Sequence, residues 1–144
     1  MLRSGLIHPE ILHALGKAGH GSLILLSDGN FPHDTAPHRS APRVYLNLRP
    51  GLISVLDALA AVLTAVPVES AAVMVPPPGT DVPPIHREFA TLLGGATPIA
   101  QMDRQAFYDA TASPHLALVV ATGEQRIYAN LLLTIGVIPE PPTG

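Results

Sequence analysis

The chain has 144 residues, of which 47% are hydrophobic and only 13% charged, and its formal net charge is −3. This length fits one domain with a substantial core. So few charges indicate that part of the surface is buried between subunits. With only eight Lys and Arg residues, the chain lacks the clustered basic face that nucleic-acid binding needs. The absence of cysteine excludes disulfides, thiolate catalysis and cysteine-based zinc sites.

The sequence shows neither a targeting segment nor a membrane span. Residues Met1 to Gly5 lead into no hydrophobic signal segment. The longest apolar stretch, Leu52 to Val66, carries Asp57, ends at Pro67 and is shorter than the roughly 20 residues that cross a bilayer. We therefore expect a cytoplasmic protein that makes no membrane contact.

Apolar periodicity and turn residues predict strands that alternate with helices. The expected helices cover Pro9–Ala18, Leu52–Ala65, Pro84–Leu93 and, with Asp103 as N-cap, Asp103–Ala112. The expected strands cover Leu23–Ser27, Arg43–Asn47, Ala71–Val75, Thr97–Gln101, Leu116–Ala121 and Tyr128–Ile138. Such alternation indicates a single α/β domain over residues 1–139, with a mainly parallel sheet of about six strands, helices on both faces and Leu116–Ala121 at its centre. Residues 140–144 are expected to form a disordered tail.

The segment from Gly19 to Pro32 carries the candidate catalytic site. His20 lies between two glycines, and Asp28 follows the short apolar strand in a Gly/Asn/Pro turn. In a parallel sheet Asp28 would emerge at the carboxyl end of its strand, where open α/β sheets bind ligands. The glycines free the backbone at His20 to bend back or to face a neighbouring subunit. A base that titrates near neutrality and a fixed carboxylate can move protons, although His20 could be structural and Asp28 a turn cap.

Three other motifs carry weaker signals. Gly19 to Ser22 resembles a phosphate loop only superficially, because it lacks a Gly-Lys-Ser/Thr ending and precedes a strand. His33, Asp34 and His38 could bind a metal, but no third strong ligand has motif spacing, so a solvated polar loop is the simpler interpretation. Ser27 lacks the Gly-x-Ser-x-Gly setting of a hydrolase nucleophile.

Two polar features follow later in the chain. Tyr128 and Asn130, which flank Ala129 at the start of the last expected strand, would project to the same side of an extended chain. Both side chains donate and accept hydrogen bonds, which suits a polyhydroxylated ligand; a core-edge tyrosine and a turn asparagine are the alternative. Arg104 lies near a helix start, where its charge opposes the dipole, so it either has another role or is simply solvated.

Together these residues resemble the D-ribose pyranase / L-fucose mutarotase family, from about Ile7 to Pro139. The motifs that match in order and spacing are Gly19-His20-Gly21, Ser27-Asp28, Phe31-Pro32, Arg104 with Ala106-Phe107-Tyr108, Thr122-Gly123-Glu124, Tyr128-Ala129-Asn130 and Gly136-Val137. The resemblance implies a ring-like homo-oligomer, a decamer or similar, with sites near subunit interfaces and no metal or organic cofactor. It also implies that His20 is the catalytic acid/base, while Asp28, Arg104, Tyr128, Ala129 and Asn130 bind the sugar.

The resemblance is closer to the fucose branch of this family. Arg104 stands where the ribose branch has histidine, whereas Gly29 and Asn30 depart from the alanine and histidine usual in the fucose branch. Residues 32–42 match the family poorly. We therefore expect a metal-independent mutarotase that interconverts the anomers of a reducing monosaccharide, with L-fucose favoured, by acid/base-catalysed ring opening. A D-ribose pyranase and a non-catalytic monosaccharide-binding protein are the alternatives.

Overall fold

The computed structural model describes residues 1–144 and contains all ten expected helices and strands. In chain order they are α1 (Pro9–Lys17), β1 (Leu23–Ser27), β2 (Arg43–Tyr45), α2 (Val55–Leu63), β3 (Val68–Met74), α3 (Ile85–Leu92), β4 (Ile99–Met102), α4 (Arg104–Thr111), β5 (Leu116–Ala121) and β6 (Leu131–Ile135). The six strands form one sheet, which confirms the predicted single α/β domain. None of the helices has the length and apolar character needed to cross a membrane.

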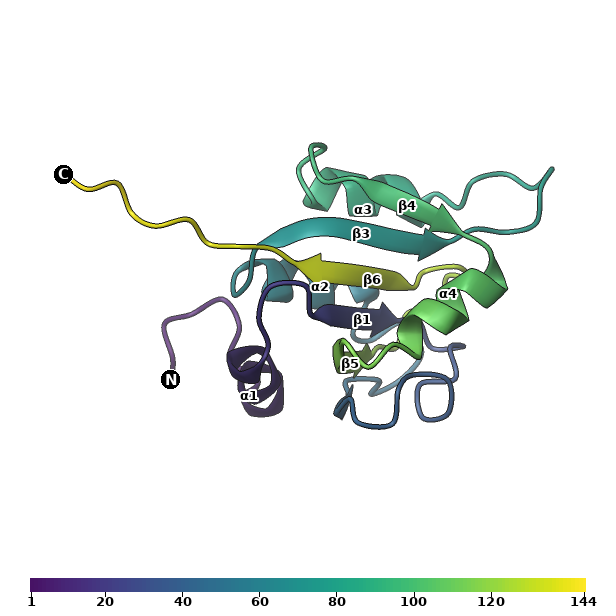
Figure 1. The fold of residues 1–144 in the computed structure, drawn as a ribbon. Helices are drawn as coiled ribbons and strands as arrows, with labels where there is room; N and C mark the ends of the chain where they lie inside the picture. Colours follow the sequence, from purple (N-terminus) through teal and green to yellow (C-terminus); the bar gives the residue numbers. More distant parts are fainter.

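The sheet is parallel except for one strand in its middle. Its order is β2-β5-β1-β6-β3-β4, and β6 runs antiparallel to both β1 and β3. Figure 1 shows the arrow of β6 pointing against its two neighbours. The amino end of β6 therefore lies beside the carboxyl ends of β1 and β3. The expectation that Leu116–Ala121 is central was wrong by one place, because burial marks a strand as interior without fixing its neighbours.

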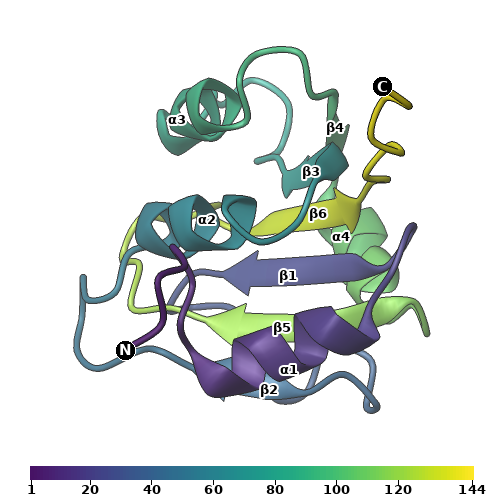
Figure 2. The same cartoon turned by 90° about the vertical axis from the view of Figure 1, so that its left-hand side faces the viewer.

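Helices cover both faces of the sheet, as predicted. Helices α1, α2 and α3 pack on one face and α4 on the other (Figures 1 and 2). The side chains of β1 alternate accordingly: Ile24 and Leu26 belong to the core under three helices, and Leu25 belongs to the core under α4. Phe89 of α3 and Phe107 of α4 are fully buried in these two cores.

Two element boundaries differ from the prediction for local reasons. Helix α2 begins at Val55 rather than Leu52, because Ser54 and Asp57 form a capping box that fixes its first turn. Strand β6 begins at Leu131 rather than Tyr128, whose φ of 57° places it in the left-handed region. The argument that Tyr128 and Asn130 share one side of an extended strand was therefore wrong. After Ile135 the chain forms no helix or strand and extends away from the sheet (Figure 1).

Candidate functional site

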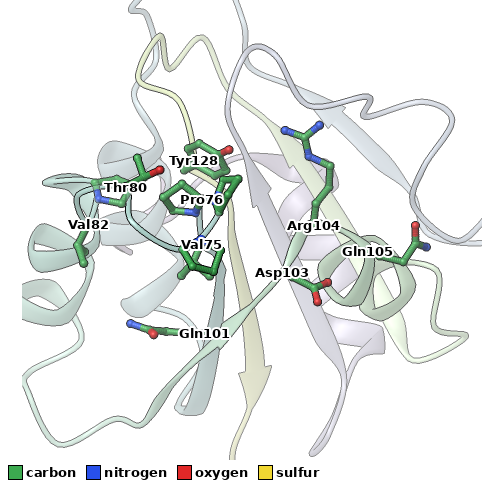
Figure 3. A pocket seen from close by; sticks show the side chains of 12 residues that line it. Val75, Pro76, Thr80, Val82, Gln101, Asp103, Arg104, Gln105 and Tyr128 are labelled. Carbon is green, nitrogen blue, oxygen red and sulfur yellow. The ribbon is translucent and has the colours of Figure 1, made fainter.

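A cavity of about 380 Å³ opens at the carboxyl end of β1, between α4 and the loop that precedes β6. It is lined by Asp28, Asn30, Phe31, Met74, Arg104, Tyr108, Ile127, Tyr128 and Asn130. A second cavity of about 790 Å³ shares Arg104 and Tyr128 with it and has a wall of prolines at Pro76–Pro78 (Figure 3). Four predicted side chains therefore meet at this end of the sheet: Asp28, Arg104, Tyr128 and Asn130.

Hydrogen bonds of Asp28 link the end of β1 to the residues just before β6. The residue is 2% exposed; Oδ1 accepts a hydrogen bond from the Asn30 N–H (2.9 Å) and Oδ2 one from the Ala129 N–H (3.2 Å). The Asp28 N–H donates in turn to Oδ1 of Asn130 (2.8 Å). Burial raises the pKa of Asp28, and the backbone donors at Asn30 and Ala129 oppose that rise. Ala129 thus contributes its backbone N–H to the site.

The polar ends of the Arg104 and Tyr128 side chains have no hydrogen-bond partner in the chain. Arg104 is the first residue of α4, and Figure 3 shows the phenol of Tyr128 pointing toward its guanidinium. The one hydrogen bond at Tyr128, from His86, goes to its backbone carbonyl and leaves the phenol unpaired. Phe31, Met74 and Ile127 make the smaller cavity partly apolar. A few convergent polar groups beside an apolar wall are typical of small-molecule sites.

His20 lies at the opposite end of the sheet. It precedes β1 whereas Asp28 follows it, so the five residues of that strand, about 16 Å of extended chain, separate them. Nε2 of His20 is 2.9 Å from Oε2 of Glu69 in β3, and the His20 side chain is 59% exposed. One chain by itself therefore does not bring His20 and Asp28 together. Sequence reasoning missed Glu69, which lies 49 residues away and in no motif.

The three candidate metal ligands after β1 turn to separate partners. Nδ1 of His33 is 2.8 Å from Oγ of Ser27, and Nδ1 of His38 is 2.8 Å from Oγ of Ser40. Asp34 accepts a hydrogen bond from the Tyr45 hydroxyl. Burial lowers the pKa of His33, and the nearby Asp28 opposes this shift. No group of three or more His, Cys, Asp or Glu side chains lies close enough together to hold a metal ion.

Arg43 holds the loop between β1 and β2 in shape. Its guanidinium donates hydrogen bonds of 2.6–3.5 Å to backbone carbonyls of this loop. The accepting residues are His33, Asp34, Pro37, His38, Arg39 and Ala41. A planar guanidinium that offers five N–H groups in a fixed fork suits such a cluster of acceptors. One side chain thus holds six backbone carbonyls of this loop.

Glu124 anchors the loop that carries Tyr128. Its carboxylate, on a residue that is 5% exposed, accepts hydrogen bonds from Nε and Nη2 of Arg126, each 3.0 Å long, and from the Val55 N–H. Arg126 also donates to Glu88 of α3 (2.7 Å). Hydrogen bonds from Arg126 lower the pKa of Glu124 below its ordinary value of 4.5. The loop is therefore tied to both α2 and α3.

A Glu124→Gln variant tests this anchor. Because the pKa of Glu124 is lower in the folded state, its stabilising contribution is present above about pH 4.5 and is lost as pH falls through the folded-state value. We expect the variant to lose about 1–3 kcal/mol of unfolding free energy at pH 7 and to show a shallower decline below pH 4.5. Urea unfolding between pH 7 and pH 3 measures both effects. Glu140→Gln in the exposed tail is the control; identical pH slopes in Glu124→Gln and wild type would contradict the expectation.

The structure is that of an α/β protein with a cavity at the carboxyl end of β1, the place where open α/β sheets bind ligands. The chain belongs to the RbsD / FucU transport protein family, which matches residues 1–138. A D-ribose pyranase of Paracidovorax citrulli is 35% identical, with 95% of this chain and 98% of that protein covered. A fucose mutarotase of Danio rerio is 34% identical, covering 91% of this chain and 89% of the relative. The family resemblance expected from the motifs is thereby confirmed.

Solved structures agree with this assignment. The crystal structure of the fucose mutarotase of Streptococcus pneumoniae in complex with L-fucose has a TM-score of 0.79 and 27% sequence identity to this chain. The alignment covers 92% of this chain and 95% of that one. The family thus includes sugar-interconverting isomerases.

Proposed function

We propose that this protein is a sugar mutarotase that interconverts the anomers of L-fucose. The observation that carries the proposal is one cavity in which a buried carboxylate (Asp28), a guanidinium without a protein partner (Arg104) and a phenol (Tyr128) converge. Carboxylate, guanidinium and phenol are complementary to the hydroxyl groups of a monosaccharide. Relatives named fucose mutarotase and D-ribose pyranase support a sugar as the ligand.

The reaction needs only proton transfers. A base removes the proton from the anomeric hydroxyl, an acid protonates the ring oxygen, and the bond between the anomeric carbon and the ring oxygen breaks to give the open-chain aldehyde. Rotation of the carbonyl and closure on its other face reverse both transfers and give the second anomer. A histidine, with an ordinary pKa of about 6.5, can serve in both directions, and such catalysis contributes about 10²–10⁴-fold in rate. We assign this role to His20, with Asp28 and Arg104 holding the sugar.

We infer that the site is completed by His20 of a second copy of the chain. His20 and the cavity lie at opposite ends of the sheet, so a head-to-tail contact would bring one end against the other. Head-to-tail contacts that close make a ring, which is the homo-oligomer that the family resemblance implies. In this arrangement the hydrogen bond from His20 to Glu69 would orient the imidazole ring.

The apolar wall favours fucose over ribose. L-Fucose carries a methyl group that ribose lacks, and Phe31, Met74 and Ile127 offer apolar surface in the same cavity as Asp28. One such carbon in an apolar pocket is worth about 1–3 kcal/mol. A D-ribose pyranase, which opens the ring in the same way, is the second candidate because the 35% identical relative has that name.

Saturation-transfer NMR tests the proposal on the anomers of L-fucose and of D-ribose, with and without the protein. We expect faster exchange for L-fucose than for D-ribose, and unchanged exchange after treatment with a chelator. Faster exchange for D-ribose would identify a pyranase. Binding of either sugar without accelerated exchange would contradict catalysis and leave a monosaccharide-binding protein.

A further inference from the structure

The peptide group between Tyr128 and Ala129 is held from both sides. Its carbonyl oxygen lies 2.9 Å from Nε2 of His86 in α3, and its N–H donates to Oδ2 of Asp28 (3.2 Å). His86, this peptide and Asp28 therefore form one continuous chain of hydrogen bonds. Chains of this kind polarise their members, so that each bond strengthens the next.

The geometry fixes the proton of His86. A carbonyl oxygen can only accept, so Nε2 carries the hydrogen. Burial lowers the pKa of His86 and so favours the neutral ring, in which Nδ1 carries no hydrogen. Nδ1 is buried and has no hydrogen-bond partner, and the residue is 8% exposed. The ring stacks on Phe89 with an interplanar angle of 20°, which sets its orientation. An unpaired buried nitrogen costs free energy that an apolar side chain would not; the hydrogen bond made by Nε2 gives a reason for a histidine at this place.

The backbone at Tyr128 needs such support. Its φ of 57° lies in the left-handed region, which is uncommon for a residue other than glycine. The hydrogen bond from His86 holds the carbonyl that follows this angle, while Asp28 holds the next N–H. In this conformation Tyr128 lines both cavities.

We propose that His86 is a positioning residue of the sugar site. Its Nε2–H fixes and polarises the Tyr128–Ala129 peptide, which in turn orients the Asp28 carboxylate and keeps the Tyr128 phenol in the cavity. His86 itself lines neither cavity and acts only through this peptide. The inference rests on the proposed sugar site.

Two substitutions at position 86 separate the hydrogen bond from mere packing. His86→Leu keeps a buried side chain but removes the donor, whereas the amide of His86→Gln can donate from nearly the same place. We expect His86→Leu to lower kcat/KM for L-fucose exchange by about tenfold and His86→Gln to recover it to within about threefold. The Ala129 amide proton signal is expected to move upfield in His86→Leu only. His13→Leu, on the exposed side of α1, is the control that should leave both readouts unchanged.

Equal losses in the Leu and Gln variants, or an unmoved Ala129 signal in His86→Leu, would overturn the proposal. A wild-type measurement keeps it testable if neither variant folds: the imidazole nitrogen shifts of His86 should report the Nε2–H tautomer, and the Nδ1–H tautomer would overturn it. If wild type accelerates no sugar exchange, the proposed function fails. The Ala129 signal and the affinity for L-fucose still decide the role of His86 in that case.

Discussion

Replacing His20 with alanine is expected to slow anomer exchange by about 10²–10⁴-fold, the range that general acid/base catalysis contributes. The unfolding free energy should hardly change, because the His20 side chain is mostly exposed and Glu69 is its only side-chain partner. Saturation-transfer NMR and urea unfolding on the same samples measure the two quantities. Exchange that persists in His20→Ala would move the proton transfer to Asp28 or Tyr128.

The same variant tests whether the site is shared between copies. His20→Ala and Asp28→Ala subunits are unfolded, mixed and refolded together. If His20 of one copy serves the cavity of the next, mixed oligomers contain some intact sites and recover part of the wild-type exchange rate. Each variant refolded alone is the control and should keep its own reduced exchange rate. No recovery in oligomers that demonstrably contain both variants would contradict the shared site.

Replacing Asp28 with alanine is expected to remove both a sugar ligand and a structural acceptor. The loss of charged hydrogen bonds should lower the affinity for L-fucose by about 10²-fold. The buried N–H groups of Asn30 and Ala129 lose their acceptor, so the unfolding free energy should fall by about 1–3 kcal/mol. Calorimetric titration with L-fucose and urea unfolding check the two effects. Asp34→Ala, an exposed acid on the following loop, is the matched control; an unchanged affinity in Asp28→Ala would exclude Asp28 from the sugar site.

The bounds of an element are best predicted from sequence where turn residues stand at its ends. β1 and β5 lie where the apolar runs Leu23–Ser27 and Leu116–Ala121 end in turn residues. The direction of β6 was not predictable, because a loop of nine residues after β5 allows either orientation and only pairing with β1 and β3 selects one. The left-handed Tyr128 likewise depends on contacts with α3 and β1, not on neighbouring residues.

The candidate site likewise contains residues whose place could be predicted from sequence and residues whose place could not. The position of Asp28 beside the cavity was predictable, because a polar residue directly after a buried strand lies at the carboxyl end of the sheet. His86 and Glu69 were not, because their partners Tyr128 and His20 lie 42 and 49 residues away and neither pair forms a motif. The role proposed for His20 requires a contact between copies of the chain, which the order of residues in one chain does not determine.

Arg43 has a consequence for how the protein can vary. It recognises the 33–41 loop through main-chain carbonyls alone, and every type of amino acid carries that group. The hold of Arg43 on the backbone therefore does not depend on which side chains the loop carries, whereas the contacts of His33 with Ser27, of His38 with Ser40 and of Asp34 with Tyr45 do. Exchange of the other loop side chains should therefore leave the hydrogen bonds from Arg43 to the loop backbone in place.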